Sequence, residues 1–142
     1  MIKQLAIFVE NRPGSLRQVA LALHEYKMKI YAFSSIDTPE FGILRMVVDK
    51  PEEAKQVLTQ KGFVTRVCEV IAVDVEEEQE MMDSLLGVFQ EGNISINYTY
   101  SSFGRMSKHP MIILHSDDIE ETEALLRAKG FHCVDSLEDK PC

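Results

Sequence analysis

The sequence predicts an α+β protein made of two copies of a βαββαβ unit, each an antiparallel sheet with its helices on one face. Two observations lead to this prediction. Sequence segments return at a nearly constant shift. Within each copy, alternating strand-like patterns and helix-spaced apolar stripes follow one another in the same order. Because βαβ crossovers are right-handed, both helices of a copy fall on the same side of its sheet, in a ferredoxin-like arrangement.

The repeat is clearest at the end of the second helix of each copy. Lys61-Gly62-Phe63 returns as Lys129-Gly130-Phe131, a shift of 68 residues. The apolar stripe of the first helix returns at a shift of 66, in the pairs Leu16 and Met82, Val19 and Leu85, Ala20 and Leu86, and Leu23 and Phe89. The two-residue difference falls in a hairpin, where insertions are tolerated. We therefore expect domains at residues 1–69 and 70–142.

In the first copy, a strand at 3–9 precedes a helix at 14–26, a second strand at 29–36 and a third at 43–48. Pro39 and Gly42 mark the hairpin between the last two. A helix at 51–61 starts at Pro51, a residue suited to a first helical turn, and ends at Gly62, which accepts a left-handed C-cap. A fourth strand begins at Phe63.

The second copy reads in the same way, with strands at 70–75, 94–101 and 111–115, helices at 77–91 and 119–129, and a last strand from Phe131. Gly104 and Pro110 mark its hairpin. The segment 63–75 contains no Pro or Gly, so the last strand of copy one is expected to run directly into the first strand of copy two.

Composition excludes several classes of function. Hydrophobic residues make up 45% of the 142 residues, but no apolar run reaches the roughly 18 needed to cross a membrane. Residues 1–71 carry a net charge of +2 and residues 72–142 a net charge of −10, which makes nucleic acid and anionic membranes poor partners. The three cysteines, Cys68, Cys133 and Cys142, fit reduced thiols in the cytoplasm better than a disulfide framework.

The stretch from Glu10 to Leu16, between the first strand and the first helix, is the main candidate site. Pro13 suits a helix start, and Gly14 lets a ligand approach the backbone. The N–H groups of Gly14, Ser15 and Leu16 would then lack intrahelical partners, and such a terminus attracts carboxylate or phosphate. A purely structural alternative stays open, in which Asn11 only caps the helix or forms an Asx-turn.

The doubled βαββαβ order and the Asn-Arg-Pro-Gly-x-Leu turn at 11–16 resemble a pair of ACT domains over essentially the whole chain. The resemblance implies a regulatory module that binds a free amino acid between its two domains. It assigns the ligand loop to Asn11, Arg12, Pro13, Gly14, Ser15 and Leu16. It assigns the opposite wall to the start of the second strand of copy two, at Ser95, Ile96 and Tyr98.

The second copy departs from the family pattern, because an acidic segment at 77–81 replaces the loop and would repel a carboxylate. Lys29 stands at the wall position of the first copy, where a neutral residue is expected. We therefore expect one working pocket in each chain. Tyr98 and Tyr100 either pack in the core or line that pocket.

Features of enzymes are absent from the sequence. The four histidines form no close cluster with cysteine or acidic residues, so neither a metal site nor a cofactor is expected. Ser15 lacks the Gly-x-Ser-x-Gly context of a nucleophile. We therefore expect a non-enzymatic, cytoplasmic protein that forms a homodimer and regulates a metabolic enzyme in trans. The alternative is a structural or interaction subunit without a small-molecule ligand.

Overall fold

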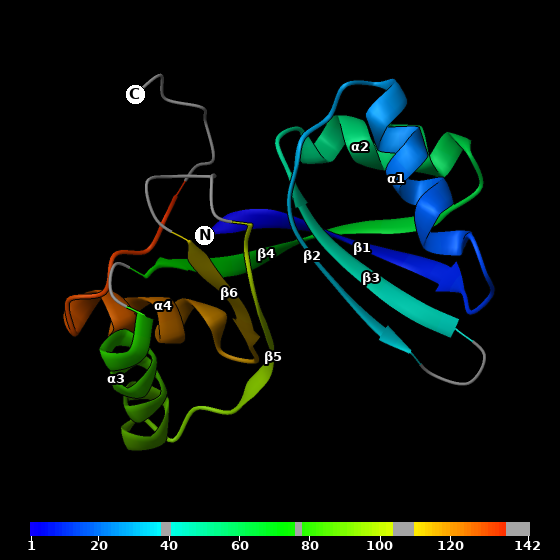
Figure 1. Cartoon of the computed structure of the whole chain (residues 1–142). Helices are drawn as coiled ribbons and strands as arrows, with labels where there is room; N and C mark the ends of the chain where they lie inside the picture. Colours follow the sequence, from blue (N-terminus) through cyan, green and yellow to red (C-terminus); the bar gives the residue numbers. More distant parts are fainter. Residues whose placement is uncertain (38–40, 76–77, 104–109, 136–142) are drawn as a thin grey trace. The chain divides into compact units, whose positions relative to one another are not determined.

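The computed structural model describes residues 1–37, 41–75, 78–103 and 110–135 (Figure 1). Contacts between Cα atoms divide the chain into two compact units. We call Lys3–Glu69 the N-terminal unit, and Val70–Cys142 together with Met1–Ile2 the C-terminal unit. The assignment of residues 1–69 and 70–142 as separate domains stays a prediction.

The N-terminal unit has the predicted βαββαβ order. Its elements are β1 (Ile2–Glu10), α1 (Ser15–Glu25), β2 (Ile30–Asp37), β3 (Phe41–Val48), α2 (Pro51–Gln60) and the first part of β4 (Val64–Asp74). The strands lie in the order β2-β3-β1-β4. β3 pairs antiparallel with both neighbours, for example Ile7 with Leu44 and Ser35 with Leu44. Figure 1 shows α1 and α2 side by side over one face of these strands.

The alternation in β1 explains where this core lies. Leu5, Ile7 and Val9 turn toward the helices and are buried, together with Leu23 of α1 and Leu58 of α2. Phe8, on the opposite face of the strand, is 38% exposed. Burying an apolar side chain of this size contributes about 1.5–3 kcal/mol, so the alternating pattern fixes which face of the strand packs on the helices.

The C-terminal unit follows the same plan. It contains the rest of β4, then α3 (Glu78–Glu91), β5 (Ile96–Ser101), β6 (Met111–Ser116) and α4 (Ile119–Ala128), with strand order β4-β6-β5. Its core includes residues from β4, β6 and both helices: Ile71, Leu114, Leu85, Phe89 and Leu126. The fold class predicted from the sequence is therefore confirmed.

The last strand, predicted to begin at Phe131, is a single bridge in the part of the segment that the structure describes. Cys133 forms a single antiparallel bridge with Val73. Two backbone hydrogen bonds flank it, from Asp74 N–H to the carbonyl of His132 at 3.0 Å and from Val134 N–H to the carbonyl of Ala72 at 2.8 Å. The segment therefore follows β4 only briefly within the described residues. The predicted hairpin residues Pro39 and Gly104, the helix residue Glu77 and the thiol of Cys142 lie outside those residues.

The predicted helix ends are confirmed in both units. Gly62 and Gly130 each have φ of 92°, a backbone conformation that L side chains rarely adopt. The following residue then donates its N–H back across the last turn, from Phe63 to Leu58 and from Phe131 to Leu126, at 3.0 Å in both cases. This pattern satisfies the last carbonyls of each helix.

β4 runs without interruption from Val64 to Asp74. The prediction that the last strand of the first copy continues directly into the first strand of the second copy is therefore confirmed. None of the helices in the described ranges has both the length and the apolar character needed to cross a membrane.

Candidate functional site

The predicted ligand loop lies between the end of β1 at Glu10 and the start of α1 at Ser15. Gly14 is the N-cap residue and has φ of 86°, in the left-handed region. A Cβ atom at this position would meet nothing within 4 Å, so glycine is required here for its backbone angle and not for space. Gln18 N–H donates to the carbonyl of Gly14 at 3.0 Å, which closes the first helical turn.

The three N–H groups expected to be open at this helix start do not behave alike. Ser15 N–H donates to the carbonyl of Arg12 at 3.3 Å, and the Ser15 side chain is buried. The expectation for Ser15 is therefore wrong, because the left-handed turn at Gly14 folds this amide back onto the loop. Among the described residues, none accepts a hydrogen bond from the N–H of Gly14 or Leu16. Two of the three N–H groups are thus without an acceptor in the part of the chain that the structure describes.

The side chains of the loop are exposed apart from Ser15. Asn11 does not cap α1, and within the described part of the chain its amide has no hydrogen-bond partner. The guanidinium of Arg12 pairs with the Glu10 carboxylate at 3.1 Å between its Nε and Oε2 atoms, with both side chains about two-thirds exposed. An exposed pair of this kind contributes about 0–1 kcal/mol, so Arg12 is held only weakly in this position.

The three predicted wall residues of the C-terminal unit point to different places. Ser95 lies just before β5 and borders a cavity. Ile96 packs partly buried against the core of its own unit. Tyr98 stacks on His115, with ring centroids 5.3 Å apart and an interplanar angle of 11°. The Tyr98 ring also stacks on Tyr100 at 6.4 Å, so it belongs to an aromatic row on the sheet.

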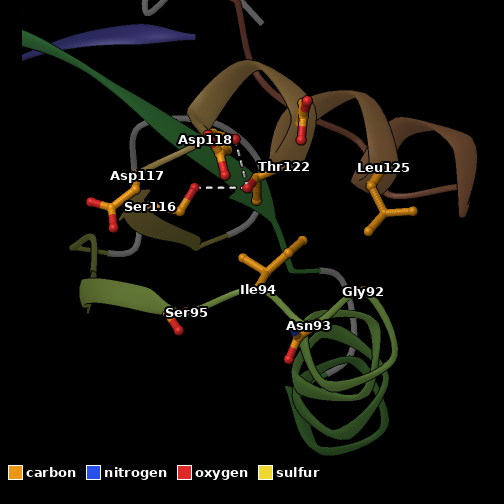
Figure 2. A pocket seen from close by; sticks show the side chains of 10 residues that line it. Gly92, Asn93, Ile94, Ser95, Ser116, Asp117, Asp118, Thr122 and Leu125 are labelled. Atoms are coloured by element: carbon orange, nitrogen blue, oxygen red, sulfur yellow. Dashed lines mark hydrogen bonds between the residues drawn. The ribbon is translucent and has the colours of Figure 1, made fainter.

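The cavity beside Ser95 has a volume of about 400 Å³ (Figure 2). It is bordered by the turn 92–95 between α3 and β5, by the loop Ser116–Asp118, and by the first turns of α4 as far as Leu125. Carboxylates of Asp117, Asp118 and Glu121 line it, and its lining contains no Lys, Arg or His. Its volume lies within the usual range for small-molecule pockets.

Two buried hydroxyl groups form the floor of this cavity. Ser116 is 1% exposed and Thr122 is 0% exposed, and their oxygen atoms lie 2.7 Å apart. Thr122 donates its hydroxyl proton to the carbonyl of Asp118 at 2.9 Å. Figure 2 shows both hydrogen bonds as dashed lines that meet at Thr122.

Gly92 makes room at the rim. A Cβ atom on Gly92 would lie 2.8 Å from Cδ2 of Leu125 and 3.2 Å from Cδ1 of Ile94, closer than ordinary contact. Any larger residue at this position would therefore push one of these side chains aside. The sequence analysis missed this cavity, although the repeat held a signal: Tyr26 and Lys29 of the first copy stand where the second copy has Gly92 and Ser95.

At the wall position of the N-terminal unit, the backbone of Lys29 is hydrogen-bonded to Asp49 of the same unit. The backbone N–H of Lys29 donates to Oδ1 of Asp49 at 3.0 Å, and Asp49 N–H donates to the carbonyl of Lys29 at 3.2 Å. In the C-terminal unit the equivalent Asp117 instead accepts a hydrogen bond from the side-chain amide of Asn97 at 3.1 Å. The aspartate at this position therefore accepts a hydrogen bond from a backbone N–H in the N-terminal unit and from a side-chain amide in the C-terminal unit.

The described residues include three further kinds of chemically active group: possible metal ligands, Cys133 and Cys68. In the described ranges, no group of three or more His, Cys, Asp and Glu residues has a geometry that could hold a metal ion. Cys133 is buried, and this burial raises the pKa of its thiol above the usual value, which disfavours the reactive thiolate. Cys68 accepts a hydrogen bond from the amide of Gln4 at 3.2 Å.

The duplicated ferredoxin-like plan with a glycine-capped loop defines the class of protein, and comparison with known proteins gives the family. The model of the ACT domain pair matches residues 1–139. The chain therefore belongs to the ACT domain pair family. None of the curated proteins matches the chain.

Solved structures of several proteins have the same fold. Protein BT0572 from Bacteroides thetaiotaomicron has a TM-score of 0.84 at 23% identity, with 98% of this chain and 96% of that chain covered. The ligand-free regulatory subunit of aspartate kinase from Thermus thermophilus has a TM-score of 0.64 at 17% identity, with 89% of each chain covered. The corresponding subunit from Thermus flavus has a TM-score of 0.59 at 16% identity, covering 89% and 88%.

Proposed function

We propose that this chain is a regulatory protein that binds a free amino acid with groups from both of its ACT units. The observation that carries the proposal is the helix start at α1. There the N–H groups of Gly14 and Leu16 have no acceptor among the described residues, and the exposed amide of Asn11 lies in the same loop. A helix N-terminus with free N–H groups favours a carboxylate.

In this proposal the ligand loop consists of Asn11, Arg12, Pro13, Gly14, Ser15 and Leu16, with Ser15 in a supporting role because its amide is already bonded. Ser95, Ile96 and Tyr98 supply the wall from the C-terminal unit. Two or three charge-assisted hydrogen bonds contribute about 1.5–3 kcal/mol each, against an association cost of at least about 4 kcal/mol. The expected dissociation constant is therefore micromolar to millimolar, which suits the sensing of a metabolite.

The remaining parts of the proposal concern where and on what the protein acts. We propose that it works in the cytoplasm, as a homodimer, and passes its ligand state to a metabolic enzyme in trans without catalysing a reaction itself. Proteins with this fold include structures named as regulatory subunits of aspartate kinase, which supports a regulatory role. The competing hypothesis is a structural or interaction subunit without a small-molecule ligand.

Thermal unfolding in the presence of each standard amino acid tests the proposal. A ligand that binds only the folded protein raises the melting temperature in proportion to its concentration and affinity. We expect one amino acid, or a few related ones, to raise it at millimolar concentration. If none does, the structural hypothesis is favoured.

The variant Asn11→Ala locates the site. Asn11 is exposed and makes no hydrogen bond within the described residues, so its loss should leave the melting temperature of the free protein unchanged. The shift caused by the amino acid should disappear. Gln56→Ala, which removes an exposed amide from α2 of the same unit, is the matched control and should keep the full shift. An unchanged shift in Asn11→Ala would place the pocket elsewhere.

A further inference from the structure

A second cavity of the C-terminal unit lies between α3 and β5 and has a volume of about 290 Å³. Leu85, Phe89 and Ile112 line it and are buried, whereas Met82 and Leu86 line it and are 39% and 51% exposed. The described residues that border this cavity carry no charge. A charged group that leaves water for such surroundings loses its hydration without gaining a partner. The cavity therefore favours an uncharged and mainly apolar occupant.

The polar side chains at the border offer an occupant few hydrogen bonds. Thr99 of β5 has one hydroxyl proton and donates it to the carbonyl of Ile113 at 3.0 Å. Tyr100, the next residue, turns its side chain to the opposite face of the strand, where its ring stacks on Tyr98. Ser101, at the end of β5, also borders the cavity and can exchange a hydrogen bond with a neutral group. Apolar contact therefore has to provide most of the affinity.

The first copy of the repeat carries a phenyl ring at the position of Thr99. Phe33 of β2 pairs with Met46 of β3, just after a register shift. Thr99 of β5 pairs with Leu114 of β6, also just after a register shift. Met46 and Leu114 belong to the cores under the helices, so the side chains opposite them face the helices as well. The second copy therefore lacks a ring that the first copy supplies from its own chain.

Larger side chains on α3 leave this space open. Ala20 and Leu23 of α1 correspond to Leu86 and Phe89 of α3, at the shift of 66 residues. The cavity between α3 and β5 nevertheless has about 290 Å³. In another protein, a cavity of about 150 Å³ lined by Leu, Ile and Phe side chains stays dry and binds benzene. The larger cavity of this chain therefore has room for one ring or for two fused rings.

From these observations we propose that the cavity between α3 and β5 binds a small, uncharged aromatic molecule of one or two fused rings. The ring takes the place that Phe33 fills in the first copy, and it covers exposed apolar surface of Met82 and Leu86. This site goes beyond the amino-acid site proposed above and uses no residue of the α1 loop. The two sites share Ile96, which borders the cavity and was assigned to the wall of the amino-acid site.

Indole is the probe for this site, and its own fluorescence reports binding because the chain contains no tryptophan. Titration of indole with the full chain should give a saturable change in fluorescence, with a dissociation constant on the order of 1 mM. Absence of a saturable change would overturn the proposal.

Two competitors of similar size test whether the site selects an uncharged ring. Benzyl alcohol should displace indole. Benzylamine carries an ammonium group at neutral pH and should displace indole at least about tenfold less effectively, because its charge would be desolvated. The net charge of −8 attracts benzylamine to the chain as a whole, so a preference for the alcohol comes from the cavity. Equal displacement by both compounds would contradict the proposal.

Two pairs of variants place the ring in the cavity. Thr99→Phe restores the ring of the first copy and should abolish indole binding, whereas Thr59→Phe adds the same ring at an exposed site of α2 and should leave it unchanged. Leu86→Ala should weaken indole about two- to fivefold, because part of the apolar border is lost. Leu21→Ala, at a similarly exposed leucine of α1, should have no effect. Unchanged binding in either Thr99→Phe or Leu86→Ala would overturn the assignment.

The loop variant Asn11→Ala separates this site from the amino-acid site. It should bind indole as well as the unmodified protein does, because the loop contributes nothing to the cavity. If Asn11→Ala lost indole binding, the ring would bind at the loop, and the cavity assignment would be wrong. Indole has neither a carboxylate nor an ammonium group, so its titration gives the same result whether or not any amino acid raises the melting temperature.

Discussion

At the turn after the first helix of each unit, the N-terminal unit carries Tyr26 and Lys29, and the C-terminal unit carries Gly92 and Ser95. The backbone is the same on both sides of the comparison: Lys27 and Asn93, which precede the strand in each unit, both have positive φ, at 57° and 53°. The two copies therefore keep the turn and carry different side chains. In the C-terminal unit these side chains border a polar cavity.

The helix starts after the first strand of each unit differ in a complementary way. In the N-terminal unit, α1 follows Pro13 and Gly14, and the N–H groups of Gly14 and Leu16 have no acceptor among the described residues. In the C-terminal unit the corresponding segment, 77–81, is acidic and contains neither proline nor glycine. The comparison shows that the two copies keep the same order of elements while their turns carry side chains of different charge.

The strongest test of the shared core uses equivalent leucines. Leu58 of α2 and Leu126 of α4 are both fully buried at the same position of the repeat. Leu58→Ala and Leu126→Ala should each lower the free energy of unfolding by about 2–5 kcal/mol, through lost burial and the cavity left behind. Urea denaturation measures both values. Leu21→Ala, at a 47% exposed site, is the control and should change little. A decrease of less than about 1 kcal/mol in the free energy of unfolding of either Leu58→Ala or Leu126→Ala would show that the two cores are not equivalent.

The helix ends test the shared backbone with a smaller effect. Because Gly62 and Gly130 have φ of 92°, Gly62→Ala and Gly130→Ala should each cost about 1–2 kcal/mol from the left-handed backbone. Gly87 lies inside α3, where a Cβ atom would meet nothing within 4 Å. Gly87→Ala should therefore stabilise the protein by about 0.5–1 kcal/mol. Thermal or urea unfolding compares the three variants. A change of the same sign in all three free energies of unfolding would contradict the assignment of Gly62 and Gly130 as left-handed helix caps.

The smallest predicted effect concerns an ion pair of the C-terminal unit. The α-ammonium of Met1 lies 2.9 Å from Oε2 of Glu123 and 3.4 Å from Oδ1 of Asp135. Partial burial acts to lower the pKa of this ammonium, but the hydrogen bonds and charges of Glu123 and Asp135 outweigh it and raise the pKa. The ion pair should therefore stabilise the protein fully below about pH 8, and this stabilisation should be lost as the pH rises through the raised pKa.

Unfolding experiments at about pH 7 and about pH 10 measure this dependence. Glu123→Gln should lower the free energy of unfolding by about 1 kcal/mol at the lower pH and by less at the higher pH, because the two partners are only 13% and 17% exposed and water screens the pair incompletely. Glu120→Gln is the control, since Glu120 makes no ion pair within the described residues. The same loss at both pH values in Glu123→Gln would exclude a contribution from the ammonium.

Most of the fold could be predicted from the sequence because its determinants are local and repeated. The alternation of Leu5, Ile7 and Val9 set the buried face of β1, and Gly62 and Gly130 set two helix ends. The last strand was predicted to begin at Phe131, but in the described residues the segment pairs only through one bridge between Cys133 and Val73. Residue type indicates where a strand can begin, but the length of the strand depends on how far a neighbouring strand can pair with it.

The candidate site was less predictable, because it depends on where individual hydrogen bonds go. The sequence places Ser15 at the helix start, but only the backbone angle of Gly14 decides that the Ser15 amide returns to Arg12. Similarly, the sequence shows that Arg12 is a cation, but only the structure shows that its guanidinium pairs with the Glu10 carboxylate. Finding the cavity beside Ser95 from the sequence would have required a comparison of equivalent turns in the two copies. A search for a motif within one segment does not make that comparison.

The uninterrupted course of β4 has a consequence for how this chain could be divided. The boundary between the compact units falls between Glu69 and Val70, inside a strand whose earlier part neighbours β1 and whose later part neighbours β6. Gene fission at that point would separate Met1–Ile2, and with them the ion pair of Met1 and Glu123, from the rest of the C-terminal unit. A half of this protein is therefore not a module that recombination could move to another gene intact.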